Sequence, residues 1–217
     1  MPNHLVVDPI EETTVAASHP TSVPQYMHFA RRVSTLLAPA PVSALLVLFV
    51  APYHTRNLLV AYIYAAVTLF FLTLGPLIFV LLGVRSGKLS DIDLSRRTER
   101  TWPFLFGLAS AMLGLFVLSY LHGPRALETA LVATAVGSLV LMVTTWWWKI
   151  SIHAATLAGA VTMLAALYGP AVLLALFLLV LVCWSRVVLR RHTLAQVVAG
   201  SLVSIALTIA VILLRGI

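Results

Sequence analysis

The chain has 217 residues, of which 61% are hydrophobic and only 10% charged, and its formal net charge is +7. Water cannot be the solvent for most of such a surface, so the composition excludes an ordinary water-soluble globular protein. It predicts an integral membrane protein. The single cysteine, Cys183, lies within an apolar run, and we interpret it as a small hydrophobic residue rather than as half of a disulfide or a metal ligand.

Residues 1–34 are predicted to form a tail. They contain Pro20, Pro24 and the acidic pair Glu11 and Glu12, and they have no apolar core behind a basic start. They therefore do not resemble a cleaved signal peptide. We expect a mostly disordered tail followed by one transmembrane domain over residues 35–217.

Seven apolar runs follow, each approaching the roughly 20 residues that a helix needs to cross about 30 Å of hydrocarbon. They cover residues 36–53, 58–84, 103–121, 127–148, 153–168, 171–189 and 195–214. Because unpaired backbone groups are too costly in lipid and the runs show no alternating pattern, the spans are expected to be helices. The predicted fold class is all-α: a polytopic transmembrane helical bundle of six to seven spans.

A first polar cluster, residues 88–103, separates the second run from the third. Arg97 and Arg100 are three residues apart and would project from one side of a helix, which makes them candidates for binding phosphate. The alternative is a solvated loop in which these charges pair with the acidic residues of the same segment.

A second polar cluster follows three consecutive tryptophans, which are typical of the membrane interface. Lys149 should emerge at headgroup depth, with Ser151 next and His153 about one turn into the following span. Ionisable residues at membrane depth are functional candidates. The alternatives are a helix-capping role for Ser151 and a histidine that donates to a neighbouring carbonyl.

A third polar cluster contains Ser185, Arg186, His192 and Gln196. If the last span begins near His192, then His192 and Gln196 share one face of that helix. The alternative is the basic end of a helical hairpin with a surface histidine, in which the neighbouring arginines set the topology.

Basic residues are distributed unequally between the two sides of the predicted bundle. If all seven runs cross, one side carries Arg31, Arg32, Arg85, Lys88, Arg96, Arg97, Arg100, Lys149, Arg186, Arg190 and Arg191, and the other carries Arg56, Arg125 and Arg215. This excess predicts that the crowded side is cytoplasmic. Cations that converge at helix starts predict an anion site, most simply for a phosphate, whereas attraction to anionic lipid headgroups is the alternative.

The second and third clusters resemble signature motifs of the type 2 phosphatidic acid phosphatase (PAP2) superfamily. The third motif of that family reads serine, arginine, five residues, histidine, three residues and aspartate. Ser185, Arg186 and His192 match it, and Gln196 stands at the aspartate position. The resemblance covers about residues 58–214.

The other two motifs of the family match less completely. The second reads proline, serine, glycine, histidine, of which Ser151 and His153 are present. The first reads lysine, six residues, arginine, proline, and its phosphate-binding duty is assigned here to Arg97 and Arg100. The resemblance implies that phosphoryl oxygens are held by Arg97, Arg100, Lys149, Ser151, Ser185 and Arg186.

The resemblance also implies a mechanism that needs neither a metal nor a cofactor. His192 would attack phosphorus to form a phosphohistidine, and His153 would protonate the leaving oxygen. Gln196 would orient the imidazole where the family has a carboxylate. The alternatives are that Asp91 or Asp93 supplies an acid, or that hydrolysis has been lost.

The expected substrate is a phosphomonoester or diphosphate of a lipid: phosphatidic acid, a prenyl phosphate or diphosphate, or a lipid-linked sugar phosphate. We expect location in the bacterial cell membrane, with the motif side cytoplasmic, and no nucleic-acid partner; the oligomeric state stays open. Two other functions compete. The loop with Asp91 and Asp93 faintly resembles that of magnesium-dependent prenyltransferases of the UbiA type, and the same cations would serve a catalytically inactive relative that binds anionic lipid.

Overall fold

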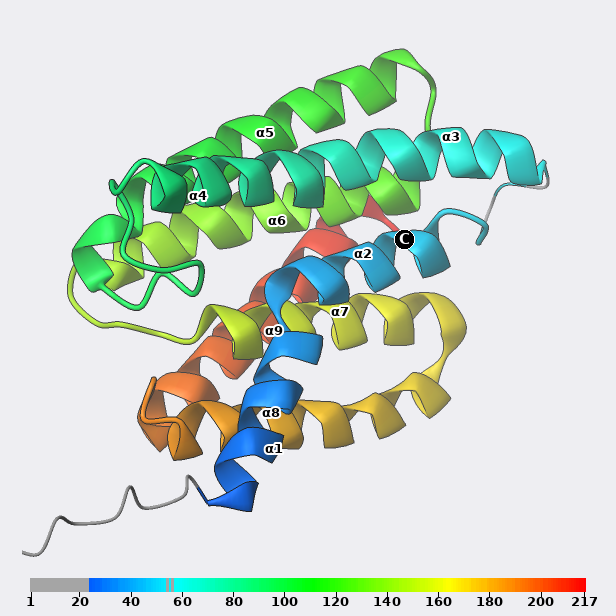
Figure 1. Ribbon diagram of the computed structural model, residues 1–217. Helices are drawn as coiled ribbons and strands as arrows, with labels where there is room; N and C mark the ends of the chain where they lie inside the picture. The colour runs from blue at the N-terminus through cyan, green and yellow to red at the C-terminus, as the bar shows by residue number, and fades with distance from the viewer. Residues whose placement is uncertain (1–23, 54, 56) are drawn as a thin grey trace, which may run out of the picture.

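The computed structural model describes residues 24–53, 55 and 57–217, and every regular element in those ranges is helical (Figure 1). The helices are α1 (Gln25–Leu36), α2 (Pro39–Val50), α3 (Leu58–Leu69), α4 (Gly75–Arg85), α5 (Thr101–Tyr120), α6 (Arg125–Thr145), α7 (Ile152–Tyr168), α8 (Leu176–Val188) and α9 (Leu194–Arg215). Three short helical segments are η1 (Phe70–Leu74), η2 (Arg97–Glu99) and η3 (Pro170–Ala175). The predicted all-α class is thus confirmed for the described part of the chain.

Five helical stretches are long and apolar enough to cross a membrane: Leu58–Arg85, Arg97–Tyr120, Arg125–Thr145, Pro170–Val188 and Leu194–Arg215. A sixth is reached if α1 and α2, which are bent by 45° at a short break, count as one span. The remaining apolar helix, α7, has 17 residues, and at about 1.5 Å per residue it is shorter than the hydrocarbon core. The described residues therefore support five or six spans, and the prediction of a seventh is not confirmed.

The predicted tail is shorter than expected, because its last residues form α1. Residues 25–34 belong to this helix, which packs against α8. Ala30, Val33 and Ser34 are its buried residues, and their spacing is that of one helical face. The many polar residues on the other face hid this amphipathic pattern. The prediction for residues 1–23 lies outside the described residues.

Proline explains both irregularities in the first half of the chain. Pro39 begins α2 and holds Ala38 in an extended conformation, which separates α1 from α2. Pro76 lies in the first turn of α4, directly after the π-helical segment η1. A proline inside a regular helix would collide with the carbonyl four residues earlier. The wider turn accommodates it, and the freed Phe71 carbonyl accepts a hydrogen bond of 2.6 Å from the Ser110 hydroxyl of α5.

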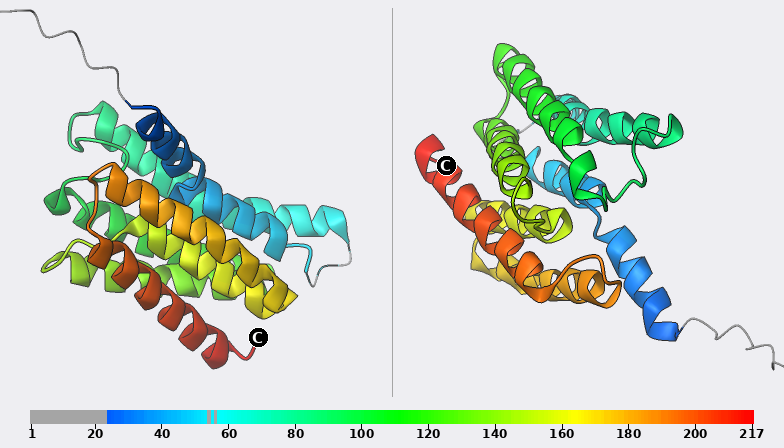
Figure 2. Two further views of the ribbon diagram at one scale, coloured as in Figure 1. Left: turned by 90° about the horizontal axis from the view of Figure 1, so that it is seen from below. Right: turned by 90° about the vertical axis from the view of Figure 1, so that its left-hand side faces the viewer.

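The helices pack in neighbouring pairs, with α5 along α6 and α7 along α9, while α2 lies against α7 (Figures 1 and 2). Gly200 allows the start of α9 to lie close to the start of α7. A Cβ atom there would lie 2.8 Å from the Ser151 carbonyl oxygen, so only glycine allows the contact. The Ser151 amide also donates to the Gln196 carbonyl at 3.2 Å. These contacts place the start of α7 beside the start of α9.

One end of the bundle collects the segments that carry the predicted site. The ends of α4, α6 and α8 and the starts of α5, α7 and α9 meet there, on the left of Figure 1. The loop of residues 86–96, which follows α4, folds over this end. We refer to it below as the charged end.

Candidate functional site

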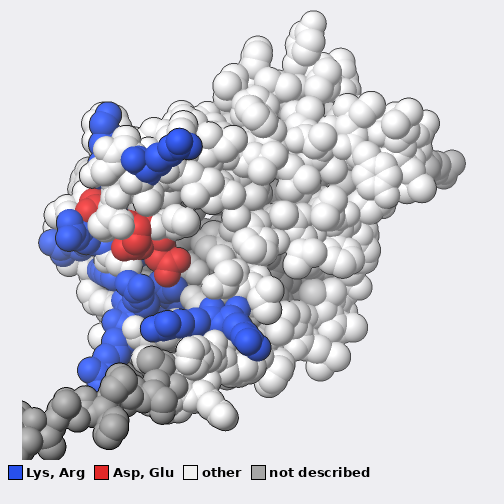
Figure 3. All heavy atoms as spheres, viewed as in Figure 1, with Lys and Arg blue, Asp and Glu red and all other residues white. Residues whose placement is uncertain are grey.

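The charged end carries the basic residues of the visible surface. In the space-filling view, Lys and Arg side chains are gathered at this end, with acidic side chains among them, and the rest of that face is uncharged (Figure 3). The exposed fractions of Arg100 and Arg186 are only 1% and 2%. Fully buried guanidinium groups are rare and need partners, so their contacts define the site.

The starts of α7 and α9 are each fixed by a capping residue. The Ser151 hydroxyl accepts a hydrogen bond from the Ala154 amide at 3.4 Å. Thr193 forms a capping box with Gln196, in which each side chain accepts a hydrogen bond from the other residue's amide. Such caps define where a helix begins, and here they place His153 in the first turn of α7 and His192 directly before the N-cap residue of α9.

His192 is held by Gln196. Its Nδ1 atom lies 3.2 Å from Gln196 Oε1, and the same oxygen accepts the Thr193 amide hydrogen at 3.1 Å. Because the amide contact identifies that Gln196 atom as an acceptor, His192 Nδ1 must be the donor. The lone pair of the neutral ring then lies on Nε2. Gln196 therefore sets the tautomer that a nucleophilic histidine requires.

Burial, together with the positive charges of Lys149, Arg100 and Arg186, lowers the pKa of His192 to about 3. The imidazole is therefore neutral at neutral pH. In an unfolded chain the ring would titrate near its ordinary pKa of 6.5. Between these two values the unfolded state binds a proton that the folded state does not, so this group lowers stability as the pH falls from about 6.5.

The free energy of unfolding is accordingly expected to decrease by about 2 kcal/mol from pH 7 to pH 5 through this residue. Chemical denaturation of the detergent-solubilised protein at both pH values would measure it. His192→Asn should remove that part of the pH dependence, and His122→Asn, at an exposed histidine between α5 and α6, should retain it. An identical pH dependence in His192→Asn and the parent protein would contradict the expectation.

Arg186, near the end of α8, joins three segments of the chain. Its Nη1 atom donates to Asp93 Oδ2 of the 86–96 loop and to the Ser34 hydroxyl of α1, each at 2.8 Å. Its Nε atom is buried and has no hydrogen-bond partner. Partial burial acts to raise the pKa of Asp93, but Arg186, His153 and Arg191 together hold it below its ordinary value, so the carboxylate is ionised.

His153 faces the same carboxylate from α7. Its Nε2 atom lies 4.0 Å from Asp93 Oδ1. This nitrogen has no hydrogen-bond partner even though the residue is buried, with only 4% of its surface exposed. The Ser34 carbonyl is the hydrogen-bond partner of this ring, and the contact must fall on Nδ1 because Nε2 is unpaired. Arg100 and Arg186 act electrostatically on both His153 and His192. The two imidazoles therefore share one pair of buried cations.

Two further cations tie the loops of the charged end together. Arg100 donates through Nε to the Leu94 carbonyl and through Nη1 to the Ile150 carbonyl, each at 2.9 Å. Lys149 Nζ donates to the Arg191 carbonyl at 3.2 Å. Burial and the charges of the neighbouring arginines lower the pKa of Lys149. The cluster thus contains an excess of positive charge, which is the electrostatic setting of an anion site.

Three residues predicted to bind phosphate use their side chains in other hydrogen bonds. Arg97 is exposed and donates to the Trp147 carbonyl at 3.1 Å. Ser185 is fully buried, and its hydroxyl donates to the Val182 carbonyl of its own helix at 2.8 Å. Ser151 is also fully buried and serves as a cap. The predicted residues that come together are Arg100, Arg186, Lys149, Gln196 and the two histidines.

Sequence reasoning missed two contributors. Ser34 was assigned to the tail, although it continues the buried face of Ala30 and Val33. Asp93 was considered as a substitute acid and as part of a loop resembling that of magnesium-dependent prenyltransferases. In the structure it contacts Arg186 and faces His153. Within the described residues, no group of three or more His, Cys, Asp and Glu side chains is placed to hold a metal ion.

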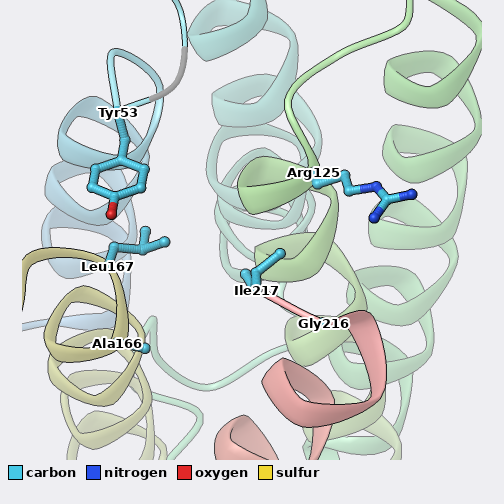
Figure 4. A pocket seen from close by; sticks show the side chains of 6 residues that line it. All are labelled: Tyr53, Arg125, Ala166, Leu167, Gly216 and Ile217. Atoms are coloured by element: carbon cyan, nitrogen blue, oxygen red, sulfur yellow. The ribbon is translucent and has the colours of Figure 1, made fainter.

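A cavity of about 410 Å³ lies at the opposite end of the bundle. Tyr53, Leu167 and Ile217 border it, and the Arg125 guanidinium points away from them (Figure 4). It contains neither histidine of the cluster, so the charged end is the better candidate for chemistry. No family model, curated protein or solved structure matches this chain.

Proposed function

We propose that this protein is a membrane-embedded phosphohydrolase that removes phosphate from a lipid through a phosphohistidine intermediate. The observation that carries the proposal is the pairing of His153 and His192 at the starts of two packed helices, beside the buried guanidinium groups of Arg100 and Arg186. Two imidazoles beside a cluster of cations are the groups that metal-independent phosphoryl transfer requires.

In the proposed reaction, the lone pair on His192 Nε2 attacks phosphorus and the bond from phosphorus to the leaving oxygen breaks. His153 gives a proton to that oxygen, which leaves as the lipid alcohol. Water then attacks the phosphohistidine, His153 takes the proton from the water, and phosphate is released. The neutral state of His192 and its fixed tautomer support the first step. In the resting site a proton on His153 Nε2 would face the Asp93 carboxylate, which supports protonation of His153 before the substrate binds.

The substrate is proposed to be amphiphilic. Exposed apolar side chains cover the helices that lead to the charged end, and Trp146 and Trp147 are exposed beside it, as expected at headgroup depth. A phosphorylated headgroup at that depth would reach the cations while its tail stays in the hydrocarbon. Phosphatidic acid, a prenyl phosphate or diphosphate, and a lipid-linked sugar phosphate all fit this description.

We also propose that the charged end faces the cytoplasm of a bacterial cell. Arg85 at the end of α4 and Lys88 in the following loop add positive charge to this end without belonging to the buried cluster. Arg31 and Arg32 lie in α1, which packs against α8. An excess of basic residues near span ends favours the cytoplasmic side.

The intermediate provides the direct test. Purified protein in detergent, mixed with a ³²P-labelled lipid phosphate in the presence of a chelator and quenched after milliseconds, should carry label that is stable in alkali and lost in acid. Tandem mass spectrometry should place it on His192. Turnover that requires magnesium would instead support the prenyltransferase alternative. Binding of the lipid without label or phosphate release would support the inactive, lipid-binding alternative.

A further inference from the structure

The Asp93 carboxylate occupies the position where an anion would be expected. Its Oδ2 atom accepts the 2.8 Å hydrogen bond from buried Arg186, and its Oδ1 atom lies 4.0 Å from the unpaired Nε2 of His153. Arg186 Nε is unpaired as well. Two buried nitrogen atoms of the cluster therefore lack hydrogen-bond partners. The neighbouring Asp93 carboxylate accepts a hydrogen bond from Arg186 Nη1 but from neither of these two atoms. Unsatisfied buried polar atoms are costly, and a ligand with more oxygen atoms than a carboxylate would pair them.

The carboxylate is also accessible and carried by a loop. The Asp93 side chain is 35% exposed, whereas that of Arg186 is 2% exposed. The loop contains two residues with left-handed backbone angles, Gly87 at φ 72° and Leu94 at φ 51°. Leu94 directly follows Asp93, and such a conformation costs a leucine about 1 kcal/mol or more. The Arg100 contact with the Leu94 carbonyl and the burial of the Leu94 side chain compensate for this strain and keep Asp93 directed at Arg186.

A cluster of cations at headgroup depth must distinguish between different phosphate groups. Most membrane phospholipids are phosphodiesters with one negative charge on phosphorus, whereas a phosphomonoester carries close to two at neutral pH because its second pKa is about 6. Arginines without an anionic partner would bind both. The Asp93 carboxylate, with one negative charge, already neutralises part of the cationic cluster, so a singly charged diester gains little by replacing it.

We propose that Asp93 is a specificity-determining residue whose carboxylate occupies the anion position of the resting site, so that dianionic phosphomonoesters displace it and phosphodiesters do not. This inference rests on the proposed function only in taking phosphate as the ligand. After displacement, Arg186 and His153 would contact the phosphoryl oxygens, and the 86–96 loop would move outward toward solvent.

The test compares the binding of two small probes, methyl phosphate and dimethyl phosphate, to the purified full-length protein at pH 8 by isothermal titration calorimetry. The protein should prefer the monoester. Asp93→Asn should bind both probes more tightly and reduce the preference by about tenfold or more, because the internal competitor is removed. The matched control is Asp91→Asn, which removes a charge from the same loop but keeps an oxygen for the Ser95 contacts; it should change neither affinity by more than about twofold. An unchanged or larger preference in Asp93→Asn would overturn the proposal.

A second measurement uses the unaltered protein and does not depend on the folding of a variant. Methyl phosphate should increase hydrogen exchange in peptides from residues 86–96, because the loop loses its contact with Arg186. Exchange that stays constant at saturating methyl phosphate would overturn the displacement. Neither measurement requires turnover, so the two proposals can fail separately: a reduced preference in Asp93→Asn without any phosphohistidine would support the role of Asp93 and reject the hydrolase.

Discussion

Replacing His192 with alanine is expected to abolish phosphate release from phosphatidic acid, whatever the alcohol that leaves. The reason is that His192 is the proposed nucleophile, and no other described imidazole is held in the same tautomer by a capping glutamine. His153→Ala should lower the rate by about a hundredfold to ten-thousandfold, which is the usual contribution of a general acid or base. Rates would be measured with purified variants in mixed micelles.

A substrate with a different leaving group distinguishes the role of His153 as the acid from the role of His192 as the nucleophile. With p-nitrophenyl phosphate, whose leaving oxygen needs no proton, His153→Ala should recover most of the rate of the first step, whereas His192→Ala should remain inactive. His122→Asn provides the control, because this exposed histidine lies between α5 and α6, away from the charged end. Equal losses for His153→Ala with both substrates would contradict the assignment of His153 as the acid. Activity in His192→Ala would contradict the assignment of the nucleophile.

Arg186→Met is expected to cause the largest loss of stability among substitutions at the charged end. Removing one partner of a buried ion pair costs about 3 to 5 kcal/mol, and we expect the lower end of this range because Asp93 is 35% exposed. The substitution also removes the hydrogen bond that joins α8 to Ser34 of α1. Methionine keeps much of the side-chain volume, so lost packing contributes little.

Thermal or chemical unfolding of the solubilised protein would measure this loss. The control is Arg190→Met, at an exposed arginine four residues after Arg186. This substitution should change the free energy of unfolding by less than about 0.5 kcal/mol. The double variant with Asp93→Asn should be more stable than Arg186→Met alone, since it no longer leaves a carboxylate without its cation. A double variant no more stable than Arg186→Met would show that the ion pair does not account for the loss.

The helical class and the convergence of the polar clusters were predictable from the sequence because they depend on periodic features. Apolar runs define helices, and runs joined by short loops return every second junction to the same end. Lys149, Arg186 and the two histidines are brought together in this way. The contact between His192 and Gln196 was predicted from a shared helix face. The structure forms it differently, because α9 begins at Leu194 and the Gln196 side chain folds back over the capping residue Thr193 to reach His192.

Other features depend on tertiary contacts that have no local pattern. Ser34 reaches Arg186 because Pro39 separates α1 from α2 and α1 packs on α8. Arg97 and Arg100 are equivalent in spacing, yet one guanidinium is exposed and the other fully buried, because only Arg100 reaches the carbonyls of Leu94 and Ile150. The position of Asp93 depends on the left-handed conformation of Leu94, for which the sequence offers no signal.

The short helix α7 has a consequence for biogenesis. It is enclosed by α2, α8 and α9, and its amino-terminal amide finds its acceptor only on α9. During synthesis, a nascent chain that still lacks its last helix leaves His153 without its neighbour across the Gly200 contact. Assembly of the two histidines therefore waits for docking of the final segment. Under the proposed function, a partly inserted chain would not act on the phosphorylated lipids around it.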